Sequence, residues 1–496
     1  MNGVFSGMDM RRIRRRCAAL LLALLTAAAL PAGALEDTAY DYILDGGVRR
    51  PIPKTYRHVR TIQSLGGEYG SFDGVQDLFV DGADNLYIVD TGNNRVVKTT
   101  TGFEVLAVYA GSEEDPLGHP EGVFVDTDLS LYIADTQNSR ILHLAPDGRT
   151  IEAFGVPESA YLGEGFVYNP RKVAVTSTGY LYTMKGKQLL RIDANNEFKG
   201  YVGANKVGFS LKNLLIRLFA SQEQKDKLVK AEAAAYTNFI LGEDNYLYAS
   251  TADLAGGQLK KLNSVGENIL PVQPYGERAV KTGGGEADPV FADLTVDARG
   301  ILTAIDSVSA RVYQYDPAGN LLTVFGGKGS GKGYLSSPRA IAQDSGGSLY
   351  IYDANLNTIQ VYRPTAFLES VHRAVALYDG GEYDKAQAAW EEVLSTGGSY
   401  SLAYIGLGDA CYKNEAYEEA MEHYYTARDE AGYAKAFSKY RYRWFKENFL
   451  WAVLAAAAIA AAFLTAGRLL IRLSARFERL YLSTIGEKRT DGKEGK

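Results

Sequence analysis

Two apolar stretches bracket the chain, and between them short hydrophobic runs alternate with turns. Residues 17–30 (CAALLLALLTAAAL) and 449–467 (FLWAVLAAAAIAAAFLTAG) contain no charged side chain. Residues 55–364 contain short β-rich runs separated by Asp-Gly or Gly-Asn turns. Tyrosine and glycine are abundant, at 34 and 52 residues, which favours strands and turns over helix bundles. The pattern predicts a β-sheet body with targeting or anchoring segments at its ends.

The first apolar stretch has the features of a secretory signal peptide covering residues 1–34. Five arginines between positions 11 and 16 precede it, and residues 31–34 (PAGA) supply a small-residue cleavage site. An uncleaved anchor is the alternative. Cleavage would move the net charge from −6 to −10, because residues 1–34 hold five arginines and one aspartate. An acidic exported body argues against a nucleic-acid partner. Only Cys411 would remain, so no internal disulfide is expected.

The second apolar stretch, 449–467, is long enough to be a transmembrane helix. Trp444 and Trp451 suit its outer interface, and arginines at 468, 472, 476 and 479 favour a basic cytoplasmic tail, 468–496. Cations also precede the stretch, so the signal peptide decides the orientation, with the body extracytoplasmic; these cations are Lys439, Arg441, Arg443 and Lys446. A buried helix of a soluble protein is the alternative. For the tail, simple anchoring competes with a helix that binds lipid or a partner.

The central part of the chain is an internal repeat. Residues 81–97 (DGADNLYIVDTGNNRVV) match residues 126–142 (DTDLSLYIADTQNSRIL), so that Asp90 aligns with Asp135 and Arg95 with Arg140, each 45 residues on. Further copies lie at 179–182, 245–248, 300–303 and 347–350, which makes six units. A period of this length with short strands is typical of four-stranded propeller blades. The sequence therefore predicts an all-β six-bladed propeller over residues 35–364.

These repeats resemble the NHL-repeat family of β-propellers. The stretches that carry the resemblance are LYIVDTGNNRVV, PEGVFVDTDLSLYIADTQNSRI and SSPRAIAQDSGGSLYIYD, within about residues 55–364. In the third unit Lys185 replaces the repeated acid. The sixth unit lacks an outermost strand, and residues 55–64 (TYRHVRTIQS) could supply one. Pairing the two ends in this way would remove an exposed sheet edge.

A second repeat follows in residues 365–448. It has a period of 34 residues, which resembles tetratricopeptide repeats and implies pairs of helices. Two repeats are fewer than such arrays usually need, so we expect them to pack on a third helix, 433–448. An unrelated helical stalk is the alternative. The matched positions are Tyr378, Tyr383, Ala386 and Trp390 with Tyr412, Tyr417, Ala420 and Tyr424.

Candidate catalytic groups are sparse. The pairs Asp90/Arg95, Asp135/Arg140 and Asp306/Arg311 recur at one place in each unit, so we interpret them as structural ties. The chain has five histidines without a metalloenzyme spacing, and we expect no catalytic residue, metal or cofactor. Calcium held by carboxylates alone is left open.

Three loops after the third, fourth and fifth units are elaborated and are expected to share one face. The loop 204–236 has leucines on one helical face, as in one or two amphipathic helices; the loops 267–288 and 326–337 are glycine-rich. Because function in repeat proteins concentrates on such insertions, we expect a binding face there. The alternative is that the helices cap the channel and the glycines are linkers. Its candidate residues are Leu214, Arg217, Arg278, Lys281, Lys328 and Lys332.

The stretch 326–333 (GGKGSGKG) is one residue short of a phosphate-binding loop. Gly333 stands where that motif needs a hydroxyl, and a strand rather than a helix is expected to follow. We therefore expect no nucleotide at this loop.

The whole arrangement resembles uncharacterised bacterial membrane proteins that combine a signal peptide, an NHL propeller, helical repeats and one C-terminal span. Such proteins are often encoded beside carbohydrate transporters. The resemblance implies an extracytoplasmic binding or scaffold protein with a membrane-protein partner, for which a transporter is one candidate. The alternatives are a propeller lactonase or lyase acting on a sugar or polysaccharide, and a structural adaptor without a small ligand.

Overall fold

The structure is a computed structural model that describes residues 40–159, 162, 166–203, 235–252, 256–280, 284–329 and 331–490. The expected signal peptide and the expected helices of the loop 204–236 lie almost wholly outside these residues. The chain divides into two compact units, Met1–Ala376 with Glu392–Tyr400, and Leu377–Glu391 with Ser401–Lys496. We describe each unit on its own.

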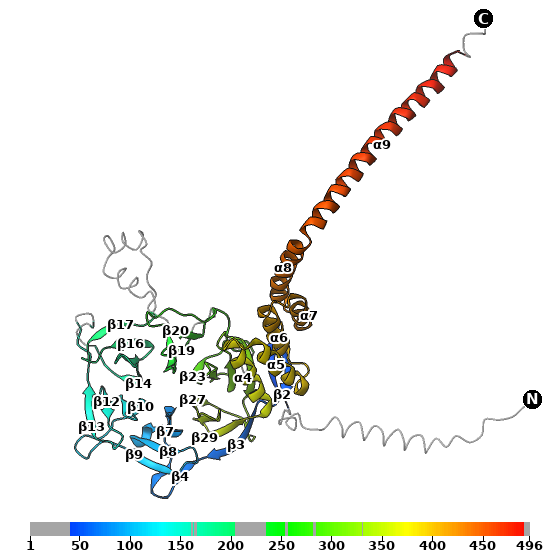
Figure 1. Ribbon diagram of the computed structural model, residues 1–496. Helices are drawn as coiled ribbons and strands as arrows, with labels where there is room; N and C mark the ends of the chain where they lie inside the picture. Colours follow the sequence, from blue (N-terminus) through cyan, green and yellow to red (C-terminus); the bar gives the residue numbers. More distant parts are fainter. Residues whose placement is uncertain are drawn as a thin grey trace, which may run out of the picture. The chain divides into compact units, whose positions relative to one another are not determined.

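The first unit is a six-bladed β-propeller, as the repeat predicts (Figure 1). Blades 1 to 3 each have four antiparallel strands in chain order. Their bounds are β6 (Asp77–Val80), β7 (Asn85–Asp90), β8 (Arg95–Thr100) and β9 (Val105–Tyr109); β10 (Pro120–Val125), β11 (Leu131–Asp135), β12 (Arg140–Leu144) and β13 (Thr150–Phe154); β14 (Pro170–Val175), β15 (Leu181–Lys185), β16 (Gln188–Ile192) and β17 (Phe198–Tyr201).

Blades 4 to 6 depart from this plan. Blade 4 has three strands in its sheet, and blades 5 and 6 receive strands from the N-terminal part of the chain. Their bounds are β18 (Tyr236–Leu241), β19 (Leu247–Thr251) and β20 (Leu259–Leu262); β23 (Phe291–Val296), β24 (Leu302–Asp306), β25 (Arg311–Tyr315) and β26 (Leu321–Gly326), with β1 (Tyr40–Asp45) and β2 (Val48–Pro53); β27 (Pro338–Gln343), β28 (Leu349–Asp353), β29 (Thr358–Pro364) and β3 (Tyr56–Ile62).

The predicted closure of the propeller is confirmed. Strand β3 pairs antiparallel with β29, from Ile359 opposite Ile62 to Pro364 opposite Tyr56. Ser345 of blade 6 also bonds to Asp84 of blade 1 through its N–H (2.8 Å) and hydroxyl (2.6 Å). The hairpin of β1 and β2 was not predicted; it extends blade 5 through the pairing of Tyr42 with Val324.

The core lies between the blades. The first strand of each blade packs on the first strands of its neighbours, around the axis seen in Figure 1. The second strands β11, β24 and β28 are buried along their whole length, because neighbouring blades cover both of their faces. This burial explains why runs such as LYIAD and LYIYD are hydrophobic without a polar alternation.

Six helices follow the propeller: α4 (Ala366–Asp379), α5 (Tyr383–Thr396), α6 (Ser401–Lys413), α7 (Tyr417–Ala427), α8 (Glu430–Glu447) and α9 (Phe449–Thr490). Within the first unit, His372 on α4 bonds through its Nε2 to Oε1 of Gln314 on β25 at 2.6 Å. The hydroxyl of Tyr400 donates to the carbonyl of Leu322 on β26 at 2.9 Å. Parts of the helical segment therefore belong to the propeller unit.

The second unit shows the 34-residue period in its geometry. The rings of Tyr378 and Tyr383 lie 5.5 Å apart at 56°, and those of Tyr412 and Tyr417 lie 5.6 Å apart at 60°. Helix α8 packs on α7, with Ala436 in one buried cluster with residues of α6 and α7. The predicted packing on a third helix is confirmed for the second repeat, which is formed by α6 and α7.

Helix α9 is long and apolar enough to cross a membrane over Phe449–Leu482. The helix runs on without a break to Thr490, so the basic segment after residue 467 is helical as far as the structure describes it.

Candidate functional site

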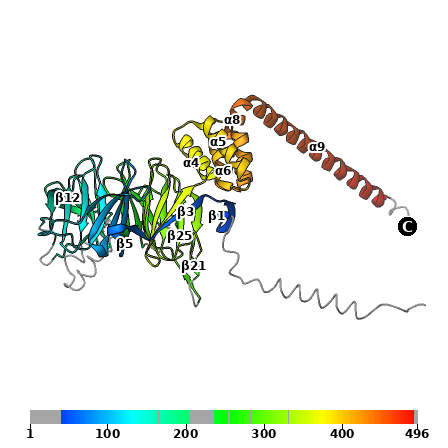
Figure 2. The same ribbon diagram turned by 90° about the horizontal axis from the view of Figure 1, so that it is seen from below.

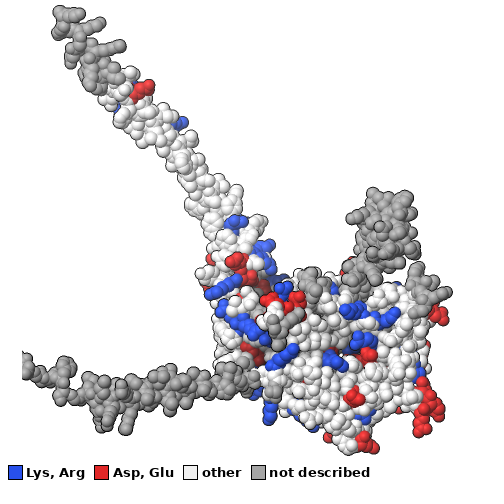
Figure 3. Space-filling model, turned by 180° about the vertical axis from the view of Figure 1, so that it is seen from behind, with Lys and Arg blue, Asp and Glu red and all other residues white. Residues whose placement is uncertain are grey.

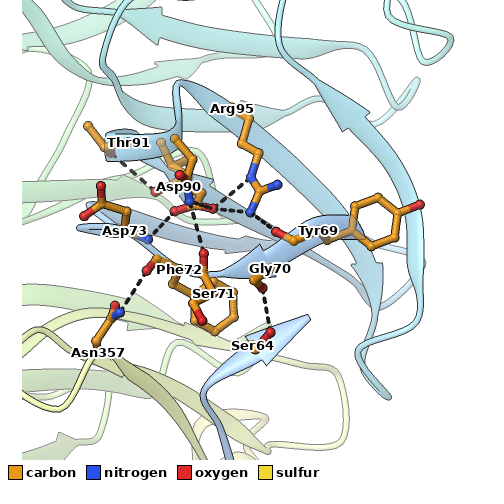
Figure 4. A network of polar contacts seen from close by, with 12 residues as sticks. Ser64, Tyr69, Gly70, Ser71, Phe72, Asp73, Asp90, Thr91, Arg95 and Asn357 are labelled. Carbon is orange, nitrogen blue, oxygen red and sulfur yellow. Dashed lines mark hydrogen bonds and ion pairs between the residues drawn. The ribbon is translucent and has the colours of Figure 1, made fainter. Parts of the chain in front are cut away.

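The repeated aspartates are structural ties, as the sequence indicates (Figure 4). Asp90 ends β7, and its Oδ1 accepts the N–H of Asp73 at 2.7 Å. Its Oδ2 accepts from Nε of Arg95 at 2.8 Å, and Arg95 also donates to the carbonyl of Tyr69 at 2.6 Å. The buried carboxylate therefore holds the loop that enters the blade against the turn η2 (Thr91–Asn93).

Blades 2 and 5 repeat this tie with variations. Asp135 accepts the N–H of Gly118 at 2.7 Å and Nε of Arg140 at 2.7 Å. Asp306 accepts the N–H of Val290, but Arg311 donates to Glu277 at 3.2 Å. Each pair thus serves its own blade and builds no common pocket.

In the third blade, Lys185 stands at the position of the repeated aspartate and makes a different contact. Its Nζ lies 3.9 Å from the centroid of the Phe166 ring, which precedes that blade. A cation–π contact therefore occupies the place of the repeated carboxylate tie.

The glycine-rich loop 326–337 is part of the same system. The N–H groups of Ser336 and Ser337 donate to the carboxylate of Asp353. Strand β27 follows directly at Pro338. A phosphate-binding loop presents its amides to the ligand at a helix N-terminus, whereas these amides bind a protein carboxylate. The absence of a nucleotide at this loop stays a prediction.

Three of the six candidate residues of the elaborated face lie in the described part of the chain. Arg278 is exposed and pairs with Asp288 at 2.9 Å and Glu286 at 3.4 Å, beside the small hairpin of β21 (Ala279–Val280) and β22 (Glu286–Ala287). Figure 2 shows this hairpin projecting from the propeller. Lys328 and Lys332 are exposed, and neither pairs with an acid among the described residues. Leu214, Arg217 and Lys281 lie outside the described residues.

The predicted loop 267–288 begins later than expected. Asn268 forms an isolated antiparallel β-bridge with Leu262, and the N–H of Ile269 donates to the carbonyl of Lys261 at 2.9 Å. The N–H of Gly257 donates to the carbonyl of Gln273 at 2.8 Å. Residues up to about 273 therefore form an irregular fourth strand of blade 4, which glycine and asparagine concealed in the sequence.

A buried charged group at the propeller axis was missed by the sequence reasoning. Asp77 of blade 1, Lys172 of blade 3 and Asp293 of blade 5 have exposed fractions of 1%, 8% and 1%. Each lies on the first strand of its blade. Asp77 and Asp293 stand opposite the last-but-one residue of the second strand, and Lys172 lies in the bulge at the same level. We call these three residues the axial triad.

Hydrogen bonds join the axial triad to the remaining blades. Nζ of Lys172 donates to Oδ1 of Asp77, whose Oδ2 accepts the N–H of Val123 in blade 2 at 3.0 Å. Asp293 accepts Nδ2 of Asn238 in blade 4 at 2.7 Å and the N–H of Ile341 in blade 6 at 2.8 Å. Blades 1, 2 and 3 thus form one hydrogen-bonded group and blades 4, 5 and 6 a second, and the two groups are coupled by the electrostatic attraction between Lys172 and Asp293.

The axial triad holds two acids and one cation. Burial alone would lower the pKa of Lys172, but the carboxylates of Asp77 and Asp293 outweigh burial and raise it. Burial raises the pKa of Asp293 to about 7, against the attraction of Lys172. Burial raises the pKa of Asp77 as well, so both acids hold a proton more readily than an exposed aspartate, which brings the group closer to charge balance.

This donor set does not fit a divalent metal. A metal at the axis would need several carboxylates or imidazoles, whereas the ammonium of Lys172 occupies the bonding position on Asp77. Among the described residues no group of three His, Cys, Asp or Glu side chains could hold a metal ion.

A groove of about 290 Å³ lies between blades 3 and 4, at the turns that join their first and second strands. Arg191 lies 5.4 Å from the Tyr180 ring and donates to the carbonyl of Ser264 at 3.2 Å. The hydroxyls of Thr176 and Thr178 and the amide of Asn245 complete the lining. The groove therefore offers an aromatic face, a cation and neutral polar groups to a ligand.

The fold defines a class: a six-bladed propeller followed by a helical segment with one candidate membrane helix. No model of a known protein family matches the chain, and no curated protein matches it. Solved structures with a similar fold include a streptogramin B lyase, at 9% identity, covering 63% of this chain and 98% of that chain with a TM-score of 0.41.

Two further structures match to a similar extent. One is a protein of unknown function from Bacteroides thetaiotaomicron, at 16% identity, covering 64% of this chain and 80% of that chain with a TM-score of 0.41. The other is a gluconolactonase from Xanthomonas campestris, at 11% identity, covering 63% and 95% with a TM-score of 0.39. At these identities and scores, the names of these proteins say nothing about the activity of this chain.

Proposed function

We propose that this chain is a membrane-anchored extracytoplasmic binding protein. Its propeller would present a surface to a membrane-protein partner, and α9 would hold the protein in the bilayer. A carbohydrate transporter is the partner class that the resemblance of the sequence implies.

The axial triad is the observation that carries this proposal. In a propeller the axis is where side chains from all blades converge, and convergent charged groups are what a catalytic site needs. Here these groups neutralise and bond one another: Lys172 to Asp77, and Asn238 to Asp293. The centre therefore acts as a rigid pin, which leaves recognition to loops on the two faces.

Lys328 and Lys332 are the best candidates for recognition on the elaborated face. Both are exposed and unpaired among the described residues, unlike Arg278, which has two acidic partners. An acidic partner surface could pair with them without breaking an internal contact. The Arg191 groove lies at the turns of the other face and supplies an independent comparison.

The test is a membrane pull-down of the full chain with chemical cross-linking and mass spectrometry. Lys328→Glu/Lys332→Glu should lose the partner, whereas Lys385→Glu, a helix lysine that is paired with Glu382, should retain it. Loss only with Arg191→Ala would move the partner site to the groove. Recovery of the same proteins by all variants and by an anchor-only control would refute the proposal.

The enzyme hypothesis has its own readout. A screen with sugar lactones and polysaccharides, together with metal analysis of the purified chain, should show neither turnover nor a stoichiometric metal. Turnover that Lys172→Met abolishes in a folded protein would replace a binding role by a catalytic one.

A further inference from the structure

Helix α8 has one face packed in the protein and one face that is exposed and aromatic. On the packed side, Gly432 and Ala436 are buried. Arg443 donates to the carbonyl of Glu415 at 2.9 Å, and its guanidinium lies 5.2 Å from the Tyr417 ring. These contacts fix which face of α8 points away from α7.

The outward face carries a ladder of side chains spaced four residues apart. The rings of Tyr433 and Phe437 stack with centroids 6.3 Å apart, and Arg441 lies 5.9 Å from the Phe437 ring. Phe445 contacts Phe449 edge-on at 5.6 Å, which carries the ladder into α9. From Tyr433 to Phe445 it extends about 18 Å along the axis of α8.

The side chains of this face are large and exposed. Tyr442 and Trp444 have exposed fractions of 72% and 50%, and Phe437 and Phe445 are similarly open. A contiguous aromatic surface of this length on a folded protein marks an interaction site. We call it the aromatic face of α8.

All charged side chains between Tyr433 and Lys446 of α8 are cations. Between Tyr433 and Lys446 the sequence has five cations and no acid. Arg443 is used in packing, and Lys435 lies 4.4 Å from the Tyr412 ring. Lys439, Arg441 and Lys446 remain for an external partner. Figure 3 shows blue side chains, with red ones among them, near the start of α9, whose first part is white.

We propose that the aromatic face of α8 lies in the headgroup region of the membrane and binds anionic lipids there. The inference rests on the membrane anchoring in the proposed function and names the surface on which the helical unit sits. Tyr, Trp and Phe suit the interface, and Lys and Arg pair with anionic headgroups.

Continuity of the chain favours lipid over a protein partner. Phe449 begins the candidate span directly after Asn448, so the end of α8 must stand at the bilayer surface if α9 crosses it. Asn448 leaves helical geometry (φ −108°, ψ 19°), which separates α8 from α9 and lets the two helices differ in direction. A helix lying at the interface buries its apolar face about 5–10 Å deep, which matches an aromatic face running the length of α8.

The test uses the full chain in lipid nanodiscs and tryptophan quenching by brominated lipids. Trp451→Phe leaves Trp444 as the reporter over a constant background from Trp390, which is 3% exposed. Brominated phosphatidylglycerol should quench Trp444 more strongly than brominated phosphatidylcholine at the same mole fraction. Lys439→Gln/Arg441→Gln/Lys446→Gln should abolish that preference. The matched control, Lys328→Gln/Lys332→Gln, should retain it.

Trp444→Phe, which leaves Trp451 as the reporter, separates failure of this inference from failure of the anchor. Quenching of Trp451 with no quenching of Trp444 would overturn the lipid contact and leave the anchor intact. Absence of both would overturn the anchor as well. Equal quenching of Trp444 by the two lipids would overturn the anionic preference. Protection of Trp444 only at high protein-to-disc ratio would assign the aromatic face to a second copy.

Discussion

Removing Lys172 tests the axial triad most directly. In Lys172→Met the carboxylate of Asp77 keeps its bond from the N–H of Val123 but loses its cation. Breaking a buried pair from one side costs about 3–5 kcal/mol. The alternative for the protein is to protonate Asp77; at pH 7 this costs about 4 kcal/mol, from a reference pKa near 3.9 and about 1.4 kcal/mol per unit. Both routes predict a loss of about 4 kcal/mol.

The loss should depend on pH with a defined sign. Burial already raises the pKa of Asp77 in the folded protein, and loss of the Lys172 cation raises it further, so the destabilisation is absent below about pH 4 and grows as pH rises. At pH 5 the same calculation gives about 1.5 kcal/mol. Denaturant unfolding of the full chain in detergent, followed by circular dichroism at both pH values, measures it.

Two variants calibrate this measurement. Arg171→Met removes the neighbouring cation on β14, which is about half exposed and pairs with Glu121, and should cost no more than about 1 kcal/mol. Lys172→Met/Asp77→Asn removes both charges and should recover most of the loss. If Lys172→Met matched Arg171→Met at pH 7, the axial triad would not be a structural pin.

Three further predictions follow from the fold. Burial lowers the pKa of His372 to about 3, so in acid the unfolded chain binds a proton that the folded chain does not bind. The free energy of unfolding should therefore fall by about 1.4 kcal/mol per pH unit as pH drops from about 6.5 toward 3. His372→Gln should flatten that slope in acid unfolding curves. Deleting residues 35–65 removes β3 and should leave an aggregating propeller in size-exclusion chromatography, with a soluble monomer as the contrary result. A Cβ at Gly122 would lie 2.6 Å from the carbonyl oxygen of Arg171, so Gly122→Ala should lose about 1–3 kcal/mol in the same unfolding assay, whereas Gly155→Ala, where a Cβ meets nothing, should not.

The sequence predicts the propeller because the second strand of each blade has one environment. It is covered on both faces, and in blades 1, 2, 5 and 6 it ends in an acid that accepts turn amides, so LYIVD, LYIAD and LYIYD recur. The closing strand was predictable for a related reason: blade 6 lacks one strand, and an unpaired sheet edge is costly. The hairpin of β1 and β2 has no counterpart in the repeat. It is held by Glu277, which accepts two hydrogen bonds from Arg49 at 2.8 and 2.9 Å across 228 residues.

The axial residues could not be predicted in this way, because their identity does not repeat from blade to blade. At one level of the first strands the six blades carry Asp77, Gly122, Lys172, Asn238, Asp293 and Ala340. No two neighbours in this order are alike, since each side chain meets a different partner across the axis.

The order of these residues nevertheless has a physical logic. Each aspartate is followed, one blade on, by a small residue, Gly122 or Ala340, and each accepts the N–H of the next residue in that blade, Val123 or Ile341. At Gly122 the small residue also makes room for the next blade, because a Cβ there would lie 2.6 Å from the carbonyl oxygen of Arg171. Lys172 of blade 3 then pairs with Asp77 of blade 1, and Asn238 of blade 4 pairs with Asp293 of the adjacent blade 5. The pattern appears only around the axis, between residues 46 to 95 positions apart in the sequence, so no local motif reveals it.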